Sequence, residues 1–94
     1  MKFLHTLAYG LDMVIPIDQI KKICNKNGNN EGYAMVCAVT VDDILGIPLG
    51  HMCDEKSVNF REYISELMKI ISVAPEWSTI RTCDNNGNWE LEIE

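Results

Sequence analysis

The sequence predicts a single α+β domain: an antiparallel-rich sheet of about five strands, with one amphipathic helix packed on one face and a β-hairpin at the C-terminus. Three observations lead to this prediction. Residues 60–73 have helical periodicity, residues 33–41 are almost wholly apolar, and apolar and acidic residues alternate after an Asn-Gly pair near the C-terminus. A chain of 94 residues has room for one core, so we expect one domain over residues 1–94.

The helix shows the clearest pattern in the chain. Apolar residues recur at i, i+3, i+4 and i+7 from Phe60 to about Val73, and polar residues fill the other side. Asn59 precedes the first turn and Glu62 follows three residues later, which is the arrangement of a capping box. Pro75 lacks the amide hydrogen that a continuing helix needs. We therefore expect one main helix over residues 60–73.

Three segments before the helix have strand character. Phe3–Tyr9 and Met13–Ile17 form two strands joined at Gly10. Because Pro16 cannot donate to a ladder, the second strand should lie at an edge or end there. Tyr33–Val41 is apolar on both faces, which is typical of a central strand covered on each side.

The segment between these strands is less clear. Ile17, Ile20 and Ile23 are spaced by three residues, and Asp18 could cap a first turn. Residues 17–24 fit both a short helix and a continuing edge strand, and we favour the helical turn. The Asn- and Gly-rich residues 25–32 should form an exposed connection.

The C-terminal residues predict a hairpin. Asn86-Gly87 is a pair that favours a two-residue type I′ turn. The register that follows pairs Thr82 with Leu91, Arg81 with Glu92 and Ile80 with Ile93. The last strand would then turn Trp89, Leu91 and Ile93 toward the core and Glu90, Glu92 and Glu94 toward solvent. Together with the other elements, we expect a core of Phe3, Leu7, Ile15, Val36, Val39, Phe60, Ile64, Leu67, Ile71, Ile80, Leu91 and Ile93.

Composition and charge narrow the function. The net charge of −6 argues against non-specific nucleic-acid binding, which depends on Lys and Arg. No apolar run is long enough to span a bilayer, and the first residues lack the pattern of a signal peptide. We expect a cytoplasmic protein with no cofactor, whose four cysteines are reduced thiols.

One segment, Asp42–Lys56, gathers residues that could carry chemistry: Asp42, Asp43, His51, Cys53 and Asp54. Cys53 could be a nucleophile with His51 as its base. Alternatively, His51, Cys53 and Asp54 could bind a metal, with His5 as a further ligand. Neither a third catalytic group nor paired zinc-ligand spacing is present, so we expect no catalytic residue and no metal site. A speculative ligand site at this segment remains as an alternative.

A second set of candidates points to an interface. Tryptophan is enriched both at interfaces and in small cores, so Trp77 and Trp89 fit either place. Glu90 and Glu92 lie on the solvent face of the expected hairpin, where they could meet a partner.

Four segments follow one another in a recognisable order: Lys2–Gly10, Val14–Ile23, Val36–Val41 and Val58–Ile64. Over residues 1–73 this order resembles the FlbD-like family, small proteins found with flagellar genes and in phage genomes. The resemblance rests on hydrophobic pattern, and Asp42–Lys56 and the final hairpin depart from it. It implies a small non-enzymatic accessory module with no catalytic residues to carry over.

Three hypotheses for function follow. The first is a protein-interaction module, either a homo-oligomer or an accessory subunit of a protein partner. The second is an acidic inhibitor, such as an immunity or phage counter-defence protein, that occupies a basic site on its target. The third is an enzyme or small-ligand binder that uses residues 42–56.

Overall fold

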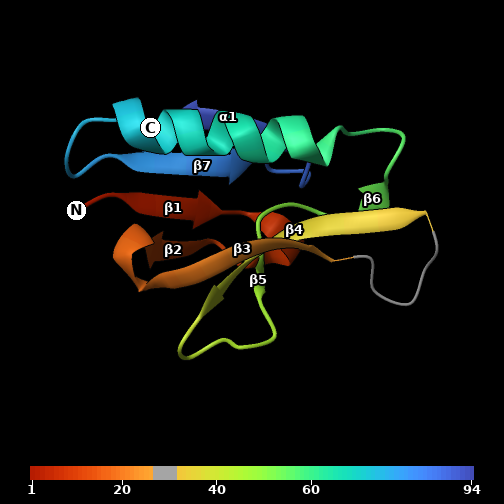
Figure 1. Cartoon of the computed structure of the whole chain (residues 1–94), viewed down its shortest axis with the longest axis horizontal. Helices are drawn as coiled ribbons and strands as arrows, with labels where there is room; N and C mark the ends of the chain where they lie inside the picture. Colours follow the sequence, from red (N-terminus) through yellow and green to blue (C-terminus); the bar gives the residue numbers. More distant parts are fainter. Residues whose placement is uncertain (27–31) are drawn as a thin grey trace.

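The computed structural model describes residues 1–26 and 32–94, which form two four-stranded sheets and one α-helix (Figure 1). The first sheet, in the order β2-β1-β7-β8, contains β1 (Phe3–Thr6), β2 (Met13–Pro16), β7 (Thr79–Cys83) and β8 (Trp89–Ile93). The second contains β3 (Ile20–Lys26), β4 (Tyr33–Thr40), β5 (Ile47–Pro48) and β6 (Cys53–Asp54), with β4 pairing to the other three. Two 3-10 turns, η1 (Ala8–Gly10) and η2 (Ile17–Gln19), flank β2, and the helix is α1 (Phe60–Val73).

The predicted fold class is confirmed: the chain is an α+β fold with one main helix and a C-terminal hairpin of β7 and β8. The strands are more numerous than the five expected, and they divide into two sheets. The difference arises because residues 20–26 form a strand and because the 42–56 segment contributes the short strands β5 and β6. Most of the expected Asn-rich connection, residues 27–31, lies outside the described residues.

Strand β1 lies inside the first sheet. It pairs antiparallel with β2, so that Leu4 faces Ile15, and parallel with β7, so that Leu4 also faces Ile80. All three of these side chains are buried. Pro16 closes the edge strand β2, as its missing donor predicted.

The helical turn favoured for residues 17–24 is wrong beyond its first three residues. The 3-10 turn η2 covers residues 17–19, and β3 then begins at Ile20. A register shift between Ile20 and Lys22 marks a bulge, which places two residues of β3 opposite one of β4. Because of this extra residue, Ile20 and Ile23 both pack against the core although three positions separate them. The bulge thus imitates helical spacing within a strand.

Helix α1 has the predicted bounds and the predicted N-terminal cap. The Asn59 carboxamide oxygen accepts the Glu62 N–H at 3.1 Å, which satisfies one free donor of the first turn. Along the inner side, Leu67 is fully buried, and the Tyr63 hydroxyl donates to the Thr82 carbonyl at 2.7 Å. Burial raises the pKa of Tyr63 far above its ordinary value. This hydrogen bond joins the helix to the sheet.

The core lies between the first sheet, the helix and β4. Strand β4 is buried on both faces, as its composition predicted. The fully or nearly fully buried members of the core cluster are Leu4, Ile15, Ala34, Val36, Ala38, Ile47, Leu49, Phe60, Tyr63, Leu67, Ala74 and Ile80. Ile93 was expected in this core but is 40% exposed, because it lies at the end of the edge strand β8.

The hairpin has the predicted register but a different turn. Ile80 pairs with Ile93 and Arg81 with Glu92, whereas a register shift follows Arg81 and removes the expected pair of Thr82 with Leu91. The turn is wider than two residues: the Gly87 N–H donates to the Asp84 carbonyl, and Asp84 also accepts from Asn88 through its side chain. The Asp84 carboxylate, which accepts several N–H groups, therefore organises the turn.

One negative finding concerns membranes. Within the described ranges, 1–26 and 32–94, the helices are too short and too polar to cross a bilayer.

Candidate functional site

The structure brings two of the five ligand-site candidates of residues 42–56 into one pocket and leaves the other three outside it. Asp42 and Asp43 are exposed in the turn between β4 and β5, whereas His51 and Cys53 follow β5 and line a pocket of about 370 Å³. Asp54 is exposed in β6 and accepts the Lys56 N–H at 2.8 Å. The two aspartates of the turn are not part of the pocket lining.

His51 holds the surrounding backbone together. Its Nε2 accepts the Tyr9 N–H at 2.9 Å, and the two rings stack with centroids 4.4 Å apart. Its backbone N–H donates to the Gly87 carbonyl, and its carbonyl accepts the Trp89 indole N–H, both at 2.9 Å. The ring nitrogen that a general base would use is therefore engaged in a structural hydrogen bond.

Cys53 has the opposite electrostatics from an activated nucleophile. Burial raises the pKa of its thiol, and the nearby Asp54 carboxylate adds to that increase, whereas reactive cysteines need a lowered pKa. Among the described residues, no group of three or more His, Cys, Asp or Glu side chains could hold a metal ion. The geometry thus gives little support to the ligand or enzyme hypothesis at this segment.

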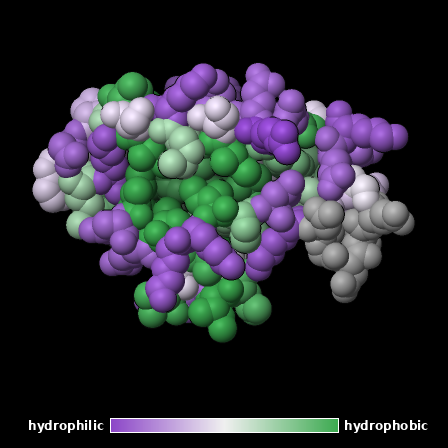
Figure 2. All heavy atoms as spheres, viewed as in Figure 1, coloured by the Kyte–Doolittle hydropathy of each residue, from purple (hydrophilic) through white to green (hydrophobic). Residues whose placement is uncertain are grey.

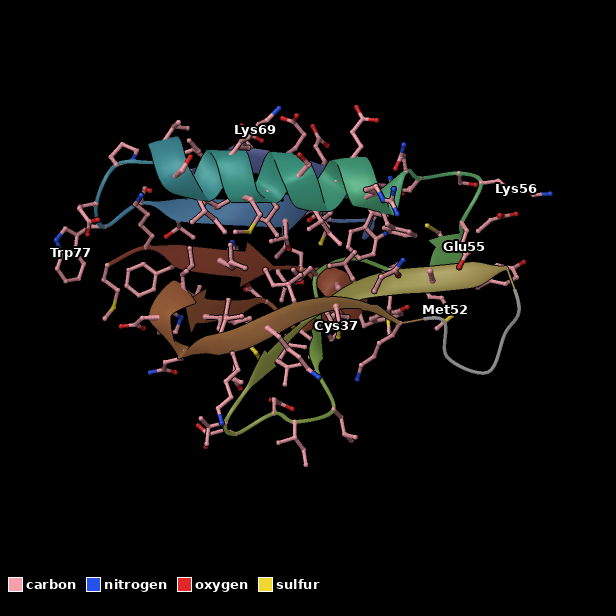
Figure 3. The ribbon with its side chains drawn as sticks, viewed as in Figure 1. Cys37, Met52, Glu55, Lys56, Lys69 and Trp77 are labelled. Carbon is pink, nitrogen blue, oxygen red and sulfur yellow. The ribbon has the colours of Figure 1, made fainter. Side chains whose placement is uncertain are left out.

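The two tryptophans lie at opposite ends of α1. Trp89 packs edge-on against Phe60 and Tyr63 in the N-terminal half of the helix, with both centroid distances at 5.1 Å. Trp77 follows the other end of the helix, is 73% exposed, and lies 6.4 Å from the Phe3 ring (Figure 3). Since a 14-residue helix is about 21 Å long, the two rings do not form one surface.

The acidic stripe of β8 is partly engaged within the chain. Glu92 accepts from Arg81 at 2.6 Å, and Glu94 contacts the His5 imidazole at 2.7 Å. Glu90 is exposed on the same strand. Because two of the three carboxylates have intramolecular partners, the stripe offers a basic target less charge than the sequence suggested.

A more prominent surface feature is an apolar groove between α1 and β3, with a volume of about 340 Å³. Figure 2 shows this apolar surface at the centre of the viewed face, bordered by hydrophilic residues. One wall comes from α1 and the other from η2 and β3. The lining residues are Ile17, Ile20, Lys22, Ile23, Ile64, Met68 and Ile71.

Local structure explains how the groove forms. Ile64, Met68 and Ile71 follow one another at i, i+4 and i+7, so they lie on one stripe of the helix. The bulge in β3 directs Ile20 and Ile23 to the same side. Met68 is 56% exposed, although its neighbours on the stripe are partly buried. Sequence periodicity could not reveal this groove, because it identifies an apolar stripe without showing how much of it another element covers.

A second apolar surface lies on the turn between β4 and β5. Ile44 and Leu45 are 77% and 79% exposed, and Val41 is also exposed. We call residues 41–45 the apolar tip; they appear as the apolar patch below the groove in Figure 2. Asp42 and Asp43 lie within the tip, so apolar and acidic side chains are displayed together.

The tip has a defined backbone. Thr40 and Gly46 both donate their N–H groups to the Asp43 carbonyl, and the Thr40 hydroxyl accepts the Asp43 N–H at 3.1 Å. Lys26 donates to the Leu45 carbonyl from β3. Gly46 has φ of +98° and approaches Cys37 so closely that a Cβ there would lie 2.9 Å from the Cys37 Cβ. The turn therefore presents its apolar side chains from a fixed position.

Comparison with known proteins adds no identity to this geometry. Family models, curated proteins and solved structures give no significant match to the chain. The FlbD-like resemblance therefore stays a prediction, and function has to be argued from the surface itself.

Proposed function

We propose that this protein is a non-enzymatic protein-interaction module, acting as a self-associating or accessory subunit, and that its contact surface is the groove between α1 and β3. The groove would bind a segment of protein that carries apolar side chains next to carboxylates. The resemblance to small accessory modules points in the same direction, as does the absence of an activated residue at Cys53.

The observation that carries the proposal is the exposure of apolar side chains in a concave, bordered surface. Six of the seven lining residues are apolar, and Met68 projects from the helix into solvent. Burying such side chains against a partner contributes about 25 cal/mol for each Å² removed from water. Methionine suits this task because its flexible thioether adapts to different partner shapes.

Charge at the border indicates the chemistry of the partner. Lys22 lines the groove, and Lys21 is the preceding residue of β3. Both side chains are exposed. Within residues 1–26 and 32–94, no ion pair involves either lysine. An acidic residue beside the apolar segment of a partner would therefore find a free cation at the rim, which favours the correct register and faster association.

A peptide-display experiment tests whether the groove binds protein segments. Random peptides would be selected on the immobilised protein, and the enriched peptides would be titrated by fluorescence anisotropy. We expect enriched peptides to combine apolar and acidic residues, and their affinity to fall about tenfold or more in Met68→Glu.

The control is Val73→Glu, which makes the same change from apolar to acidic on the same helix. Val73 lies about 140° around the helix from Met68 and is exposed, so it does not line the groove. Enrichment of peptides whose binding is equally insensitive to both substitutions would reject the groove as the contact surface.

A further inference from the structure

We infer that the groove of one copy receives the apolar tip of a second copy, so that the chain associates with itself by placing residues 41–45 against α1 and β3. This inference rests on the proposed function and names the partner for the same groove. The two surfaces are the convex and concave apolar features already described, and both belong to this chain.

The shape of the tip and its fixed backbone favour it as the occupant of the groove. Ile44 and Leu45 project from a turn whose backbone is already held by Thr40, Asp43 and Lys26. A ligand that is ordered before binding loses less conformational entropy when it docks. In contrast, an unstructured segment would have to be ordered at the moment of binding. The apolar pair Ile44–Leu45 offers the branched side chains that an isoleucine-lined groove of about 340 Å³ can pack.

The charges around the two surfaces are opposite. The tip carries Asp42 and Asp43, and the groove is lined by Lys22. None of these three takes part in an ion pair within the described chain. Insertion of Ile44 and Leu45 would bring the neighbouring aspartates to the edge of the groove that carries Lys22, where opposite charges meet.

Like charges disfavour two simpler ways of joining two copies. Pairing of the edge strand β3 with its own copy would bring lysines together, and pairing of β8 with its own copy would bring glutamates together. Tip-to-groove contact avoids both repulsions. Reciprocal exchange of tips would close the assembly as a two-fold dimer with two identical contacts.

The first experiment compares the solution masses of the wild type and two variants by light scattering in reductant. We expect a dimer for the wild type. Ile44→Ser/Leu45→Ser in the tip and Met68→Glu in the groove should each raise the dissociation constant about tenfold or more. All three positions are exposed, so circular dichroism should show that both variants keep the native fold.

Matched controls remove exposed apolar groups elsewhere. Leu11→Ser/Val14→Ser alters two exposed apolar residues outside both surfaces, and Val73→Glu alters the other side of α1. Both controls should associate like the wild type. If the controls weakened association as much as the tip and groove variants, the effect would come from a general loss of exposed apolar surface, and the inference would be overturned.

The decisive experiment mixes the two defective variants. The tip variant keeps an intact groove and the groove variant keeps an intact tip, so an equimolar mixture can form one complete contact. We expect heterodimers in the mixture under conditions where each variant alone is monomeric, measured by native mass spectrometry. A mixture that stays monomeric, or a wild type that is monomeric at its highest soluble concentration, overturns the inference.

These outcomes separate the two claims about the groove. A monomeric wild type whose groove still captures displayed peptides in a Met68-dependent manner retains the proposed function and rejects the second copy as its partner. A dimer that is indifferent to Met68, Ile44 and Leu45 rejects the tip-to-groove contact, and the peptide selection then decides the function of the groove separately.

Discussion

At the scale of single residues, the His5 imidazole lies between two carboxylates. Its Nε2 lies 2.6 Å from the Asp12 carboxylate and its Nδ1 lies 2.7 Å from the Glu94 carboxylate, while Arg81 is its neighbour on β7. A neutral imidazole has one N–H and can donate to only one of the two carboxylates. The hydrogen bond to Asp12, followed by that to Glu94, therefore raises the pKa of His5 above its ordinary value of 6.5.

This contact predicts a pH-dependent stability. Because the folded state binds the His5 proton more tightly than the unfolded state, the contribution is fully present below pH 6.5 and is lost as the pH rises through the folded pKa. Urea unfolding at a series of pH values should show a decline in the free energy of unfolding over that range. The decline should be smaller in His5→Gln, and an identical pH profile for the variant would contradict the assignment to His5.

The four cysteines should differ in the rate at which their thiols are alkylated. Cys37 and Cys83 are buried, whereas Cys24 and Cys53 are partly exposed. Burial raises the pKa of both Cys37 and Cys53, so access to the thiol distinguishes these two. Thiolate exposure controls the rate at which a cysteine is alkylated. Iodoacetamide labelling of the native protein, followed by mass spectrometry, should modify Cys24 and Cys53 well before the other two. Equal labelling of all four would indicate that the native core opens readily.

At the scale of elements, β8 packs so closely on the segment after β5 that a side chain added at Gly50 should destabilise the fold. The Trp89 indole covers Gly50, and a Cβ on Gly50 would lie 2.7–2.8 Å from three indole atoms. Gly50→Ala must therefore displace a ring that also packs on Phe60 and Tyr63.

We expect Gly50→Ala to lower the free energy of unfolding by about 1–3 kcal/mol, the usual cost of overpacking. The measurement is urea denaturation followed by tryptophan fluorescence. Asn85→Ala in the exposed hairpin turn should change the stability by less than about 0.5 kcal/mol and serves as the control. Unchanged stability of Gly50→Ala would mean that the indole can move aside freely.

Elements could be predicted from the sequence where local signals agree. For α1, periodicity, the Asn59 cap and Pro75 all indicate the same bounds. In β3 the bulge gives isoleucines a spacing of three within a strand, so periodicity favoured the wrong element. The role of His51 was equally hidden, because its partners Tyr9 and Gly87 are distant in sequence.

At the scale of the whole molecule, the tip and the groove predict rescue by charge reversal. In Lys22→Glu, the groove should repel the acidic tip of another copy, and in Asp42→Lys/Asp43→Lys the tip should repel the basic groove. Each variant alone should therefore associate more weakly than the wild type. An equimolar mixture should form heterodimers, because both of its contacts again join opposite charges.

Light scattering at two ionic strengths measures this rescue. Added salt should weaken the wild-type dimer and reduce the repulsion within each variant, because exposed charges are screened over about 8 Å at physiological ionic strength. Association that responds to neither charge reversal nor salt would mean that Lys22 and the two aspartates do not meet.

The sequence predicted the fold class but not the surface on which the proposed function depends. Asp42 and Asp43 were candidates for their chemistry, whereas the exposed Ile44 and Leu45 beside them carried no sequence signal of exposure. The groove combines residues of α1 with residues about 45 positions earlier, and only tertiary packing brings these together. Local patterns contain no information on such pairings.

The position of β1 inside its sheet also determines the order in which the strands of this sheet can pair during synthesis. During synthesis, β1 and β2 can pair as soon as both have emerged, but the other edge of β1 stays open until β7 follows more than seventy residues later. An open strand edge is a template for pairing with other chains, and pairings so distant in sequence form slowly. The nascent protein is therefore most prone to aggregate before residues 79–83 arrive, and fusion partners or chaperones that shield its first hairpin should raise the soluble yield.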